Sequence, residues 1–360
     1  MKPHQYERRV TALQSKLKEQ GVDSFVSVCP ADNAYLTGFL GSTSLLLATQ
    51  DRVLLLCDFR YAEQATKQVE AADVVRCSGS LDKQLATFVA DMKLKQLAFE
   101  PDAMTVARKN AIEASCKCEM IGMPDSCRSL RLCKEPGEID RIGAAAALAE
   151  AALEAMLTRL EPGIPESVAA GLLELEFRKR GAQGASFDTI VLFGERSSLP
   201  HGKPGDRPLQ RGDIVLVDCG CILDGYCSDL TRTFVYGSIP GDWFSEIYET
   251  THTAQEAAVK TVNAGVRACD VDAAARSVIA AAGYGDNFGH GTGHGVGLEV
   301  HEPPRLSAES DDSLEAGMVV TAEPGIYLSG QGGVRIEDLL VVTETGNVIL
   351  TRLPKELRIL

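Results

Sequence analysis

Blocks of apolar and polar residues along the first third of the chain predict a sheet flanked by helices. An amphipathic pattern at the amino-terminal end predicts a helix to about Gln20, where Gly21 ends it. Short apolar runs predict strands at 24–29, 44–49, 53–57, 74–77 and 96–100. Helical stretches are predicted near 60–70, 80–93 and 103–115. This alternation is typical of a mixed α/β sheet.

A different pattern begins after a linker near 123–126. A long Ala-rich helix is predicted to end near Leu160, and a second helix is predicted to end near Arg180. Two further helices are predicted near 242–263 and 270–282. Each pair of helices precedes strand-like apolar runs that are separated by turn residues. The pattern of two helices followed by a hairpin therefore occurs twice, which predicts two similar halves.

Two aspartates flank the first predicted hairpin. Asp218 follows one apolar run, and Asp229 precedes the next. The dipeptide Asp224-Gly225 favours a tight hairpin turn and lies midway between the two aspartates. Folding at this turn places the two carboxylates nearly opposite each other on one face of the hairpin.

Two glutamates flank a second predicted hairpin in the same way. Gly330 lies midway between Glu323 and Glu337, within a Gly-rich stretch. Strand-like runs at 318–321 and 334–336 are expected to pair across this turn. Their pairing would bring the two glutamates together.

These four carboxylates would repel one another strongly on a packed sheet unless positive charge lay between them. Two divalent cations carry four positive charges, which balances four ionised carboxylates. His294 adds an imidazole from a Gly-rich segment, where the backbone can come close to a small ligand. These residues therefore predict a dinuclear metal site that activates water and polarises a carbonyl.

Length, charge and cysteine content narrow the class of protein. A chain of 360 residues suggests two domains, and its net charge of −14 argues against nucleic acid or an anionic membrane as a partner. No apolar run approaches the ~20 residues of a membrane span, and the segment from Met1 to Glu7 is too polar for a signal peptide. We expect a cytoplasmic protein whose eleven cysteines are free thiols.

Five sequence blocks, taken in order, resemble the pattern of the proline-specific pita-bread metallopeptidases, which include prolidase and the Xaa-Pro aminopeptidases. The blocks are LPHG (199–202), the hairpin with Asp218 and Asp229, HGTGHGVGLEVHE (290–302), TAEPG (321–325) and GVRIED (333–338). Near the start, NAYLTGF (33–39) and DFRY (58–61) resemble the amino-terminal domain of creatinase and prolidase. The resemblance implies an α+β fold, with a creatinase-like mixed α/β domain at 1–128 and a pita-bread catalytic domain at 129–360.

The resemblance also implies a role for each residue of the metal site. Asp218 bridges or chelates one metal ion, and Asp229 and Glu337 bridge both ions. His294 and Glu323 complete separate coordination shells. Glu323 also takes a proton from the attacking water and passes it to the leaving proline nitrogen. Oxygen-rich ligands favour Mn²⁺, with Co²⁺, Fe²⁺ and Zn²⁺ left open.

Substrate contacts are implied in the same way. His201 and His301 match histidines that contact the substrate or stabilise the oxyanion of the tetrahedral intermediate. Phe187 and Val300 match residues of a hydrophobic proline pocket. Arg305 matches a position that binds the substrate carboxylate in prolidases, where the planar guanidinium can make two hydrogen bonds.

The expected activity is hydrolysis of the Xaa-Pro bond at the amino terminus of a dipeptide or short peptide, by a homodimer. Whether the enzyme is a dipeptidase or an aminopeptidase stays open. A methionine aminopeptidase is disfavoured by the large amino-terminal domain. A creatinase-like amidinohydrolase and a non-catalytic interaction module are alternatives that the intact ligand set argues against. His290 is expected to play a structural role beside the site.

Overall fold

The computed structural model describes residues 3–360, so the first two residues of the polar segment that begins at Met1 lie outside the described part. Within the chain, contacts between Cα atoms separate two compact units, Met1–Arg131 and Leu132–Leu360. Each unit has its own core of buried apolar side chains.

The first unit is built on a six-stranded mixed sheet with the order β4-β3-β2-β1-β5-β6. Its strands are β1 (Ser24–Ser27), β2 (Leu45–Thr49), β3 (Val53–Cys57), β4 (Asp73–Arg76), β5 (Gln96–Phe99) and β6 (Glu119–Gly122). Strand β2 lies antiparallel to both β1 and β3, whereas β3–β4, β1–β5 and β5–β6 are parallel. All residues of β1, β2 and β3 are buried, which explains the apolar runs in β2 and β3.

Helices complete this unit and largely follow the predicted pattern. They are α1 (Pro3–Glu19), α2 (Pro30–Thr37), α3 (Ala62–Gln68), α4 (Leu81–Asp91), α5 (Val106–Cys116) and α6 (Arg128–Arg131). The sequence did not predict α2, α6 or strand β6. Helix α2 is buried from its second residue to its last, so it shows no polar stripe from which a helical period could be read.

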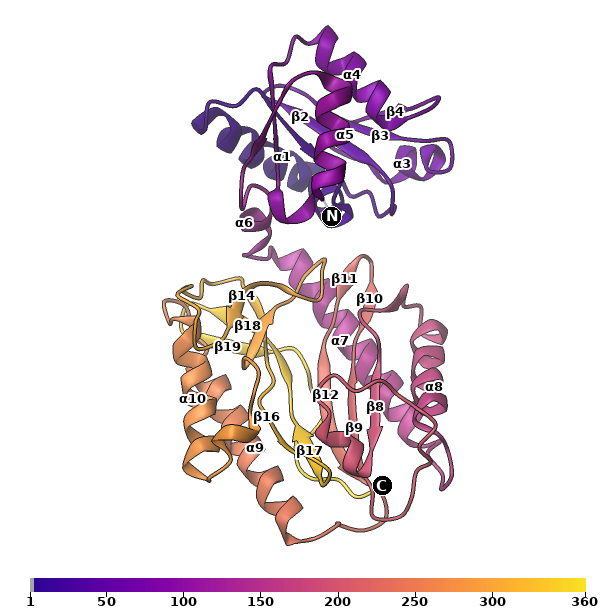
Figure 1. Ribbon diagram of the computed structural model, residues 1–360, viewed down its shortest axis with the longest axis vertical. Coiled ribbons are helices and arrows are strands. Elements are labelled where there is room, and N and C mark those ends of the chain that lie inside the picture. Colours follow the sequence, from indigo (N-terminus) through magenta and orange to yellow (C-terminus); the bar gives the residue numbers. More distant parts are fainter. Residues whose placement is uncertain (1–2) are drawn as a thin grey trace. The chain divides into compact units, whose positions relative to one another are not determined.

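The second unit repeats the order of two helices followed by strands. Its first half contains α7 (Pro136–Leu157), α8 (Glu166–Lys179), β7 (Gly184–Ala185), β8 (Ile190–Phe193), β9 (Ile214–Cys219), β10 (Cys221–Leu223), β11 (Tyr226–Cys227) and β12 (Leu230–Val235). Its second half contains α9 (Asp242–Thr261), α10 (Ala268–Ala281), β13 (Gly293–Gly295), β14 (Glu302–Leu306), β15 (Val319–Ala322), β16 (Gly325–Leu328), β17 (Gly332–Arg335), β18 (Asp338–Thr343) and β19 (Gly346–Ile349). Figure 1 shows the strands between the two helix pairs.

The two helix pairs of this unit belong to two separate buried clusters. Apolar side chains of α7 and α8 join those of β8, β9 and β12 in one buried cluster. Side chains of α9 and α10 join those of β15, β16, β17 and β18 in another. The two predicted halves are therefore confirmed, and their strands meet between the helices (Figure 1).

The first hairpin forms at the predicted turn. Leu223 pairs with Tyr226 across Asp224 and Gly225, whose φ angles are 48° and 82°, as a type I′ turn requires. Farther from the turn, β9 and β12 pair with Asp218 opposite Thr231. Asp229 lies two residues before Thr231, immediately before the first residue of β12. The two aspartates are therefore diagonal neighbours on one face, not directly opposite each other.

The second hairpin turns at Gly330, but its predicted strand partners were wrong. Strand β17 pairs with β16, and β15 pairs with β18, so 334–336 does not pair with 318–321. The chain contains four short strands here because the ladder is interrupted at the two glutamates. Ala322 pairs with Asp338 and Gly325 with Arg335, which leaves Glu323 and Glu337 opposite each other at the interruption.

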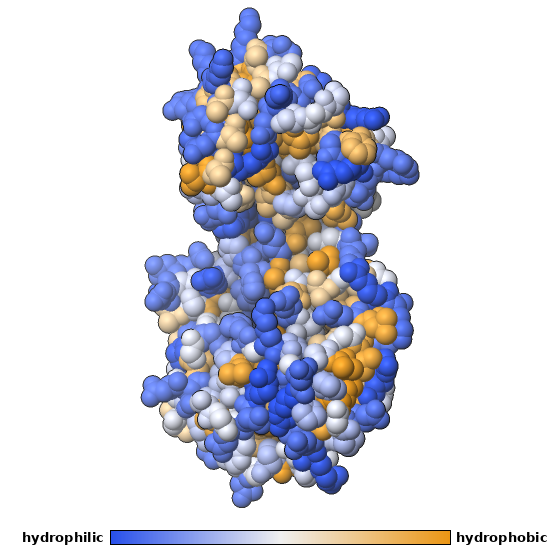
Figure 2. Space-filling model, turned by 45° about the vertical axis from the view of Figure 1, so that its right-hand side comes forward, coloured by the Kyte–Doolittle hydropathy of each residue, from blue (hydrophilic) through white to orange (hydrophobic). Residues whose placement is uncertain are grey.

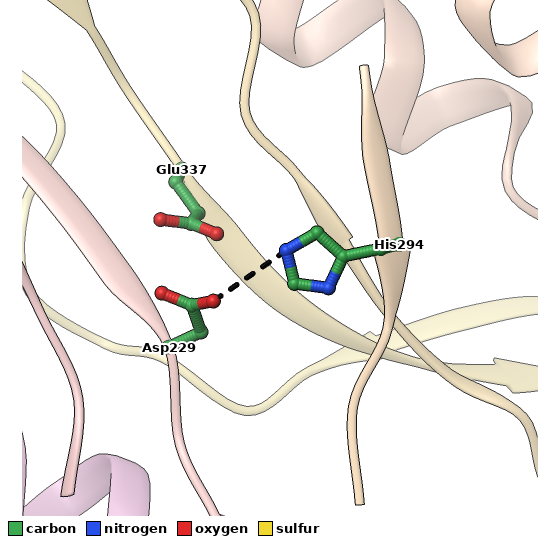
Figure 3. A group of neighbouring side chains, drawn as sticks. All are labelled: Asp229, His294 and Glu337. Atoms are coloured by element: carbon green, nitrogen blue, oxygen red, sulfur yellow. Dashed lines mark ion pairs between the residues drawn. The ribbon is translucent and has the colours of Figure 1, made fainter. Parts of the chain in front are cut away.

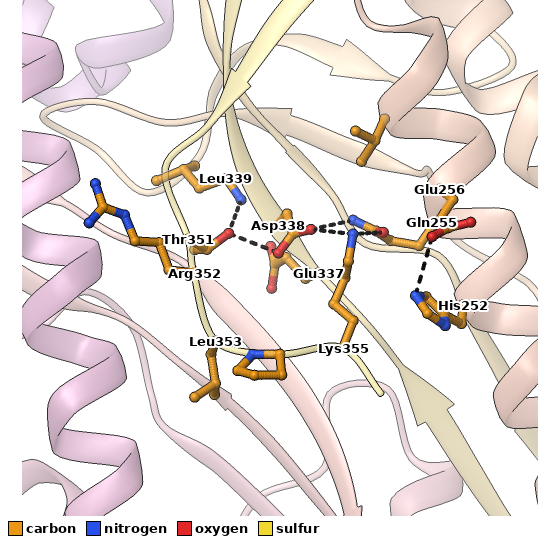
Figure 4. A network of polar contacts seen from close by, with 12 residues as sticks. His252, Gln255, Glu256, Glu337, Asp338, Leu339, Thr351, Arg352, Leu353 and Lys355 are labelled. Carbon is orange, nitrogen blue, oxygen red and sulfur yellow. Dashed lines mark hydrogen bonds and ion pairs between the residues drawn. The ribbon is translucent and has the colours of Figure 1, made fainter. Parts of the chain in front are cut away.

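A buried ion pair joins the two halves behind Glu337. The Arg232 guanidinium on β12 donates to Oδ1 of Asp338 at 2.8 Å, and both side chains are buried. Lys355, Gln255 and Thr351 surround the same carboxylate, as Figure 4 shows. Burial raises the pKa of Asp338, but the charges of Arg232 and Lys355 outweigh this effect and hold the pKa below its usual value.

Polar residues cover much of the surface seen in Figure 2, with apolar residues scattered among them. The described part of the chain contains no helix with the length and apolar character that a membrane span requires.

The Arg232–Asp338 pair yields a stability prediction. Arg232→Met removes the guanidinium and leaves Asp338 buried with less compensating charge, so we expect a loss of about 3–5 kcal/mol in the free energy of unfolding. Chemical denaturation followed by circular dichroism measures this loss. Arg358→Met is the control, because Arg358 makes only an exposed pair with Glu154 and its loss should cost no more than about 1 kcal/mol. Equal costs for the two variants would contradict the assignment.

Candidate metal centre

Three predicted ligands meet between the halves of the second unit. Asp229 lies just before β12, His294 lies on β13, and Glu337 lies between β17 and β18. One ligand atom from each residue lies within 4.8 Å of the others. Figure 3 shows the three side chains pointing toward one another. Oδ2 of Asp229 is 3.6 Å from Nε2 of His294. These distances leave room for an ion that all three side chains could contact.

Asp218 and Glu323 lie beside this group. Both line one cavity of about 340 Å³ together with Asp229 and His294. Oε1 of Glu323 is 3.3 Å from Nε2 of His294. The five residues that the sequence predicted as metal ligands are therefore brought together from five separate segments of the chain.

Crowding and burial shift the pKa values of these carboxyl groups in different directions. Burial and the neighbouring charge of Asp218 raise the pKa of Asp229 well above its usual value. Burial and the charge of Asp229 do the same for Glu337. Burial also raises the pKa of Glu323, but its hydrogen bond to His294 and nearby positive charge outweigh this effect and lower the pKa overall. The site therefore resists holding all its carboxylates ionised without added positive charge.

His294 supplies part of that charge in the protein alone. Burial lowers its pKa, but the hydrogen bond to Glu323 and the charges of Glu323 and Asp229 raise it to about 9. Nδ1 lies 3.1 Å from the carbonyl oxygen of Gly295. If Nδ1 carries the hydrogen and donates it there, the lone pair of Nε2 faces the carboxylates, which is the tautomer a metal ligand needs.

Arg335 and Thr231 hold two of the carboxylates in place. The buried Arg335 guanidinium donates to Oδ2 of Asp218 at 2.6 Å and to Oγ1 of Thr231 at 3.1 Å. Thr231 in turn donates to Oε2 of Glu337 at 2.7 Å. Arg335 also donates to the hydroxyl of Tyr327, which contacts Nε2 of His290. Sequence reasoning missed Thr231 and Tyr327, because a Thr or Tyr within a strand carries no signal that distinguishes it from core packing.

Two oxygen atoms in the site have no protein partner. Oδ1 of Asp218 and Oε1 of Glu337 are buried, and no residue within 3–360 donates a hydrogen bond to either atom. Each carboxylate is held through its other oxygen by Arg335 or Thr231. A buried unpaired carboxylate oxygen is costly, and coordination of a cation would compensate that cost. Four carboxylates and one imidazole are also a donor set that suits divalent metal ions, so the residues present fit a metal centre.

Other predicted residues surround the cavity to different extents. His201, Phe187 and His301 are among its lining residues, whereas Val300 and Arg305 are not. The ring of His301 lies 4.4 Å from that of His294, measured between centroids. Burial and the charge of His294 lower the pKa of His301, so its imidazole is favoured in the neutral form.

A buried carboxylate anchors the loop that carries His201. Glu166 on α8 is fully buried and accepts hydrogen bonds from the backbone N–H of Phe193 and of Gly205. It also pairs with Arg196 at 2.9 Å. Arg196 donates to the carbonyl oxygen of Lys203, so both sides of the loop are tied to one carboxylate.

Comparison with known proteins places this geometry in a family. Residues 140–344 match the model of metallopeptidase family M24, and residues 9–133 match the creatinase/prolidase N-terminal domain. The chain belongs to metallopeptidase family M24. The predicted family and the predicted α+β fold with a creatinase-like first domain are thereby confirmed, and so is the prediction of a metal-dependent peptidase.

Whole-chain relatives of this M24 peptidase include proteins with solved structures. An Xaa-Pro dipeptidase from Bacillus anthracis is 40% identical with a TM-score of 0.95, and the match covers 99% of this chain and 100% of that one. An X-Pro aminopeptidase from Thermotoga maritima is 37% identical with a TM-score of 0.89, over 96% and 100% of the two chains. A prolidase from Pyrococcus horikoshii is 33% identical with a TM-score of 0.91, over 97% and 99%. An uncharacterized peptidase of Bacillus subtilis is 42% identical over 98% of this chain and its own full length.

Thr231 gives a prediction that separates metal binding from stability. Thr231→Val keeps the shape of the side chain but removes the hydroxyl between Arg335 and Glu337. We expect the metal affinity to fall by about 10-fold or more, because residues that orient metal ligands typically have effects of this size. Isothermal titration calorimetry with Mn²⁺ measures the affinity.

Thr233→Val is the matched control for this variant. Thr233 is equally buried on β12 and bonds only the backbone of Arg335. It should lower stability without a comparable loss of metal affinity. If both variants bound metal equally well, Thr231 would have no part in orienting Glu337.

Proposed function

We propose that this protein hydrolyses the Xaa-Pro bond at the amino terminus of dipeptides or short peptides, at two divalent metal ions. The convergence of the five predicted ligands carries the proposal. Four of them line one cavity, and ligand atoms of Glu337, Asp229 and His294 lie within 4.8 Å of one another. Two buried carboxylate oxygens of this group have no hydrogen-bond partner within residues 3–360. The proline-specific enzymes among the solved relatives support the substrate class. The ligands in this proposal are Asp218, Asp229, His294, Glu323 and Glu337.

The bound ions would supply Lewis acidity and lower the pKa of a water toward about 7. The remaining steps belong to side chains. Glu323 lines the cavity and has a lowered pKa, so it is ionised and can accept a proton from the attacking water. Once protonated, it can deliver that proton to the leaving proline nitrogen. Neutral His301, and His201 on its anchored loop, can donate hydrogen bonds to the oxyanion that develops on the scissile carbonyl.

The finer points of the proposal concern the metal, the location, the domain boundary and the oligomer. The excess of oxygen over nitrogen ligands favours Mn²⁺, with Co²⁺, Fe²⁺ and Zn²⁺ as alternatives. A cytoplasmic location is supported by the cysteines, all of which are free within residues 3–360. The proposed domain boundary near 128 lies close to the division between the two compact units at Arg131 and Leu132, and shortly before the end of the first family match at 133. The homodimer is proposed from the family resemblance, and sedimentation velocity would measure it.

Specificity for the peptide length depends on which positively charged side chain binds the carboxylate of the proline residue. Arg305 lies directly opposite His294 on the paired strands β13 and β14, so the two side chains leave the sheet on the same face. Arg305 is exposed and makes no ion pair within the described part of the chain. Lys203 is the rival, because it lines the cavity and forms only a long, exposed pair of 3.6 Å with Asp188. We propose Arg305 as the carboxylate-binding residue, with Phe187 and Val300 forming the proline pocket.

The histidines provide a test of the proposed roles. His294→Ala should reduce the metal content, because it removes a nitrogen ligand that carboxylates cannot replace. His301→Ala should keep the metal and lower kcat by roughly 10²-fold, as the loss of an oxyanion donor typically does. His290→Ala should matter less than either, because the His290 ring contacts Tyr327, Phe288 and the carbonyl oxygen of Gly291 and is not one of the proposed metal ligands. Elemental analysis measures the metal content, and Xaa-Pro hydrolysis measures kcat. Equal metal loss in all three variants would contradict the assignment of His294 as a metal ligand.

Arg305 provides a test of substrate length. Arg305→Ala should raise KM for Xaa-Pro dipeptides by the equivalent of ~2 kcal/mol, the worth of a charge-assisted hydrogen bond, and should affect Xaa-Pro tripeptides much less. Lys203→Ala is the control for general loss of positive charge near the cavity. If Lys203→Ala showed the dipeptide-specific loss, Lys203 would be the carboxylate-binding residue. A wild-type enzyme that prefers tripeptides would be an Xaa-Pro aminopeptidase.

A further inference from the structure

The segment that carries His294 is rich in glycine, and its glycines allow neighbouring backbone to approach closely. A Cβ atom at Gly293 would lie 2.1 Å from the carbonyl oxygen of Thr321, and one at Gly291 would lie 2.9 Å from that of Leu306. Side chains are therefore excluded here by close packing. Glycine also leaves a chain with more conformational freedom than any other residue, so this segment needs contacts that hold it in place.

Helix α10 supplies such contacts through one buried ion pair. Asp272 is fully buried, and its Oδ1 accepts hydrogen bonds from the backbone N–H of Thr292 at 3.1 Å and from its hydroxyl at 2.9 Å. Arg276, one turn later on α10, pairs with both oxygens of Asp272 at 2.8 and 2.9 Å. The carboxylate is thus bound from the helix on one side and from the Gly-rich segment on the other.

Arg276 extends the same connection to two more backbone groups. Its guanidinium donates to the carbonyl oxygens of Phe288 and His290, each at 2.8 Å. The guanidinium also lies over the ring of Phe288, 4.3 Å from its centroid. The ion pair therefore holds alternate residues of the segment, 288, 290 and 292, immediately before His294.

Thr292 passes this constraint to a second predicted ligand. The carbonyl oxygen of Thr292 accepts a hydrogen bond from the backbone N–H of Glu323 at 2.8 Å. Thr292 thus links Asp272 to Glu323 through its backbone, and it precedes His294 by two positions. Nε2 of His294 and Oε1 of Glu323 lie 3.3 Å apart, so Thr292 connects Asp272 to two predicted ligands that face each other.

We propose that Asp272 and Arg276 are positioning residues of the metal centre, which fix His294 and Glu323 relative to the other ligands from a helix that never reaches the cavity. This inference rests on the proposed function, because it takes His294 and Glu323 as ligands. Metal affinity depends steeply on ligand geometry, and partners that orient ligands typically contribute 10–100-fold. The pair would act through the backbone of the Gly-rich segment and not by contact with metal or substrate.

Asp272→Asn tests the proposal, with Asp270→Asn as its matched control. Asn keeps the size of the side chain but loses the charge that pairs with Arg276. Asp270 lies on the same helix, where its exposed side chain pairs with Arg267 and accepts a hydrogen bond from Sγ of Cys269. For Asp272→Asn we expect the dissociation constant for Mn²⁺, measured by calorimetry, to rise about 10-fold. We also expect kcat at saturating Mn²⁺ to fall by a similar factor while KM changes less than about 2-fold. Asp270→Asn should match the wild type.

Thr292→Val keeps the test decisive if Asp272→Asn folds poorly. It removes only one of the hydrogen bonds to Asp272 and should weaken Mn²⁺ binding in the same direction by a smaller factor. Variants that melt at lower temperature but bind Mn²⁺ and turn over as the wild type does would overturn the proposal and leave Asp272 as a stabilising residue only. Failure of the proposed function is distinguishable, because it would appear in the wild type as absence of Mn²⁺ binding or of Xaa-Pro cleavage.

Discussion

Mutual repulsion among buried carboxylates is the constraint around which the second unit is organised. Asp218, Asp229, Glu323 and Glu337 surround one small region where burial alone already opposes their ionisation. Arg335 and His294 offset part of the negative charge, and two carboxylate oxygens stay without a partner. Divalent cations would relieve this repulsion, so the arrangement is stabilised by the ions that it is built to bind.

The fold keeps these groups together by connecting the two halves with buried polar contacts. The backbone N–H of Glu337 donates to the carbonyl oxygen of Thr231, across the junction between the halves. Arg232 binds Asp338 and the carbonyl oxygen of Glu337 on the side away from the cavity. Glu337 is therefore held from behind by residues that do not line the cavity. Such support explains how short strands and Gly-rich loops can hold ligands in a defined geometry.

The sequence predicted those parts of the site that depend on residue type and local turns. Asp224-Gly225 and Gly330 marked the two turns, and the turns brought the acidic pairs together. The pairing of β15 with β18 could not be predicted, because the interruption at Glu323 and Glu337 depends on the tertiary environment and not on apolar pattern. Thr231, Tyr327 and Asp272 were missed for a related reason. Their importance comes from partners that lie far away in sequence, and single residues in a helix or strand give no local signal of such contacts.

Titration of the metal-free wild-type protein with Mn²⁺ by calorimetry tests the central claim most directly. Four converging carboxylates and one imidazole predict two bound ions per chain, with proton release as His294 and the carboxyl groups become ligands. Xaa-Pro hydrolysis should appear as the sites fill. Saturation at one ion or none, or full activity in the metal-free protein, would contradict the account.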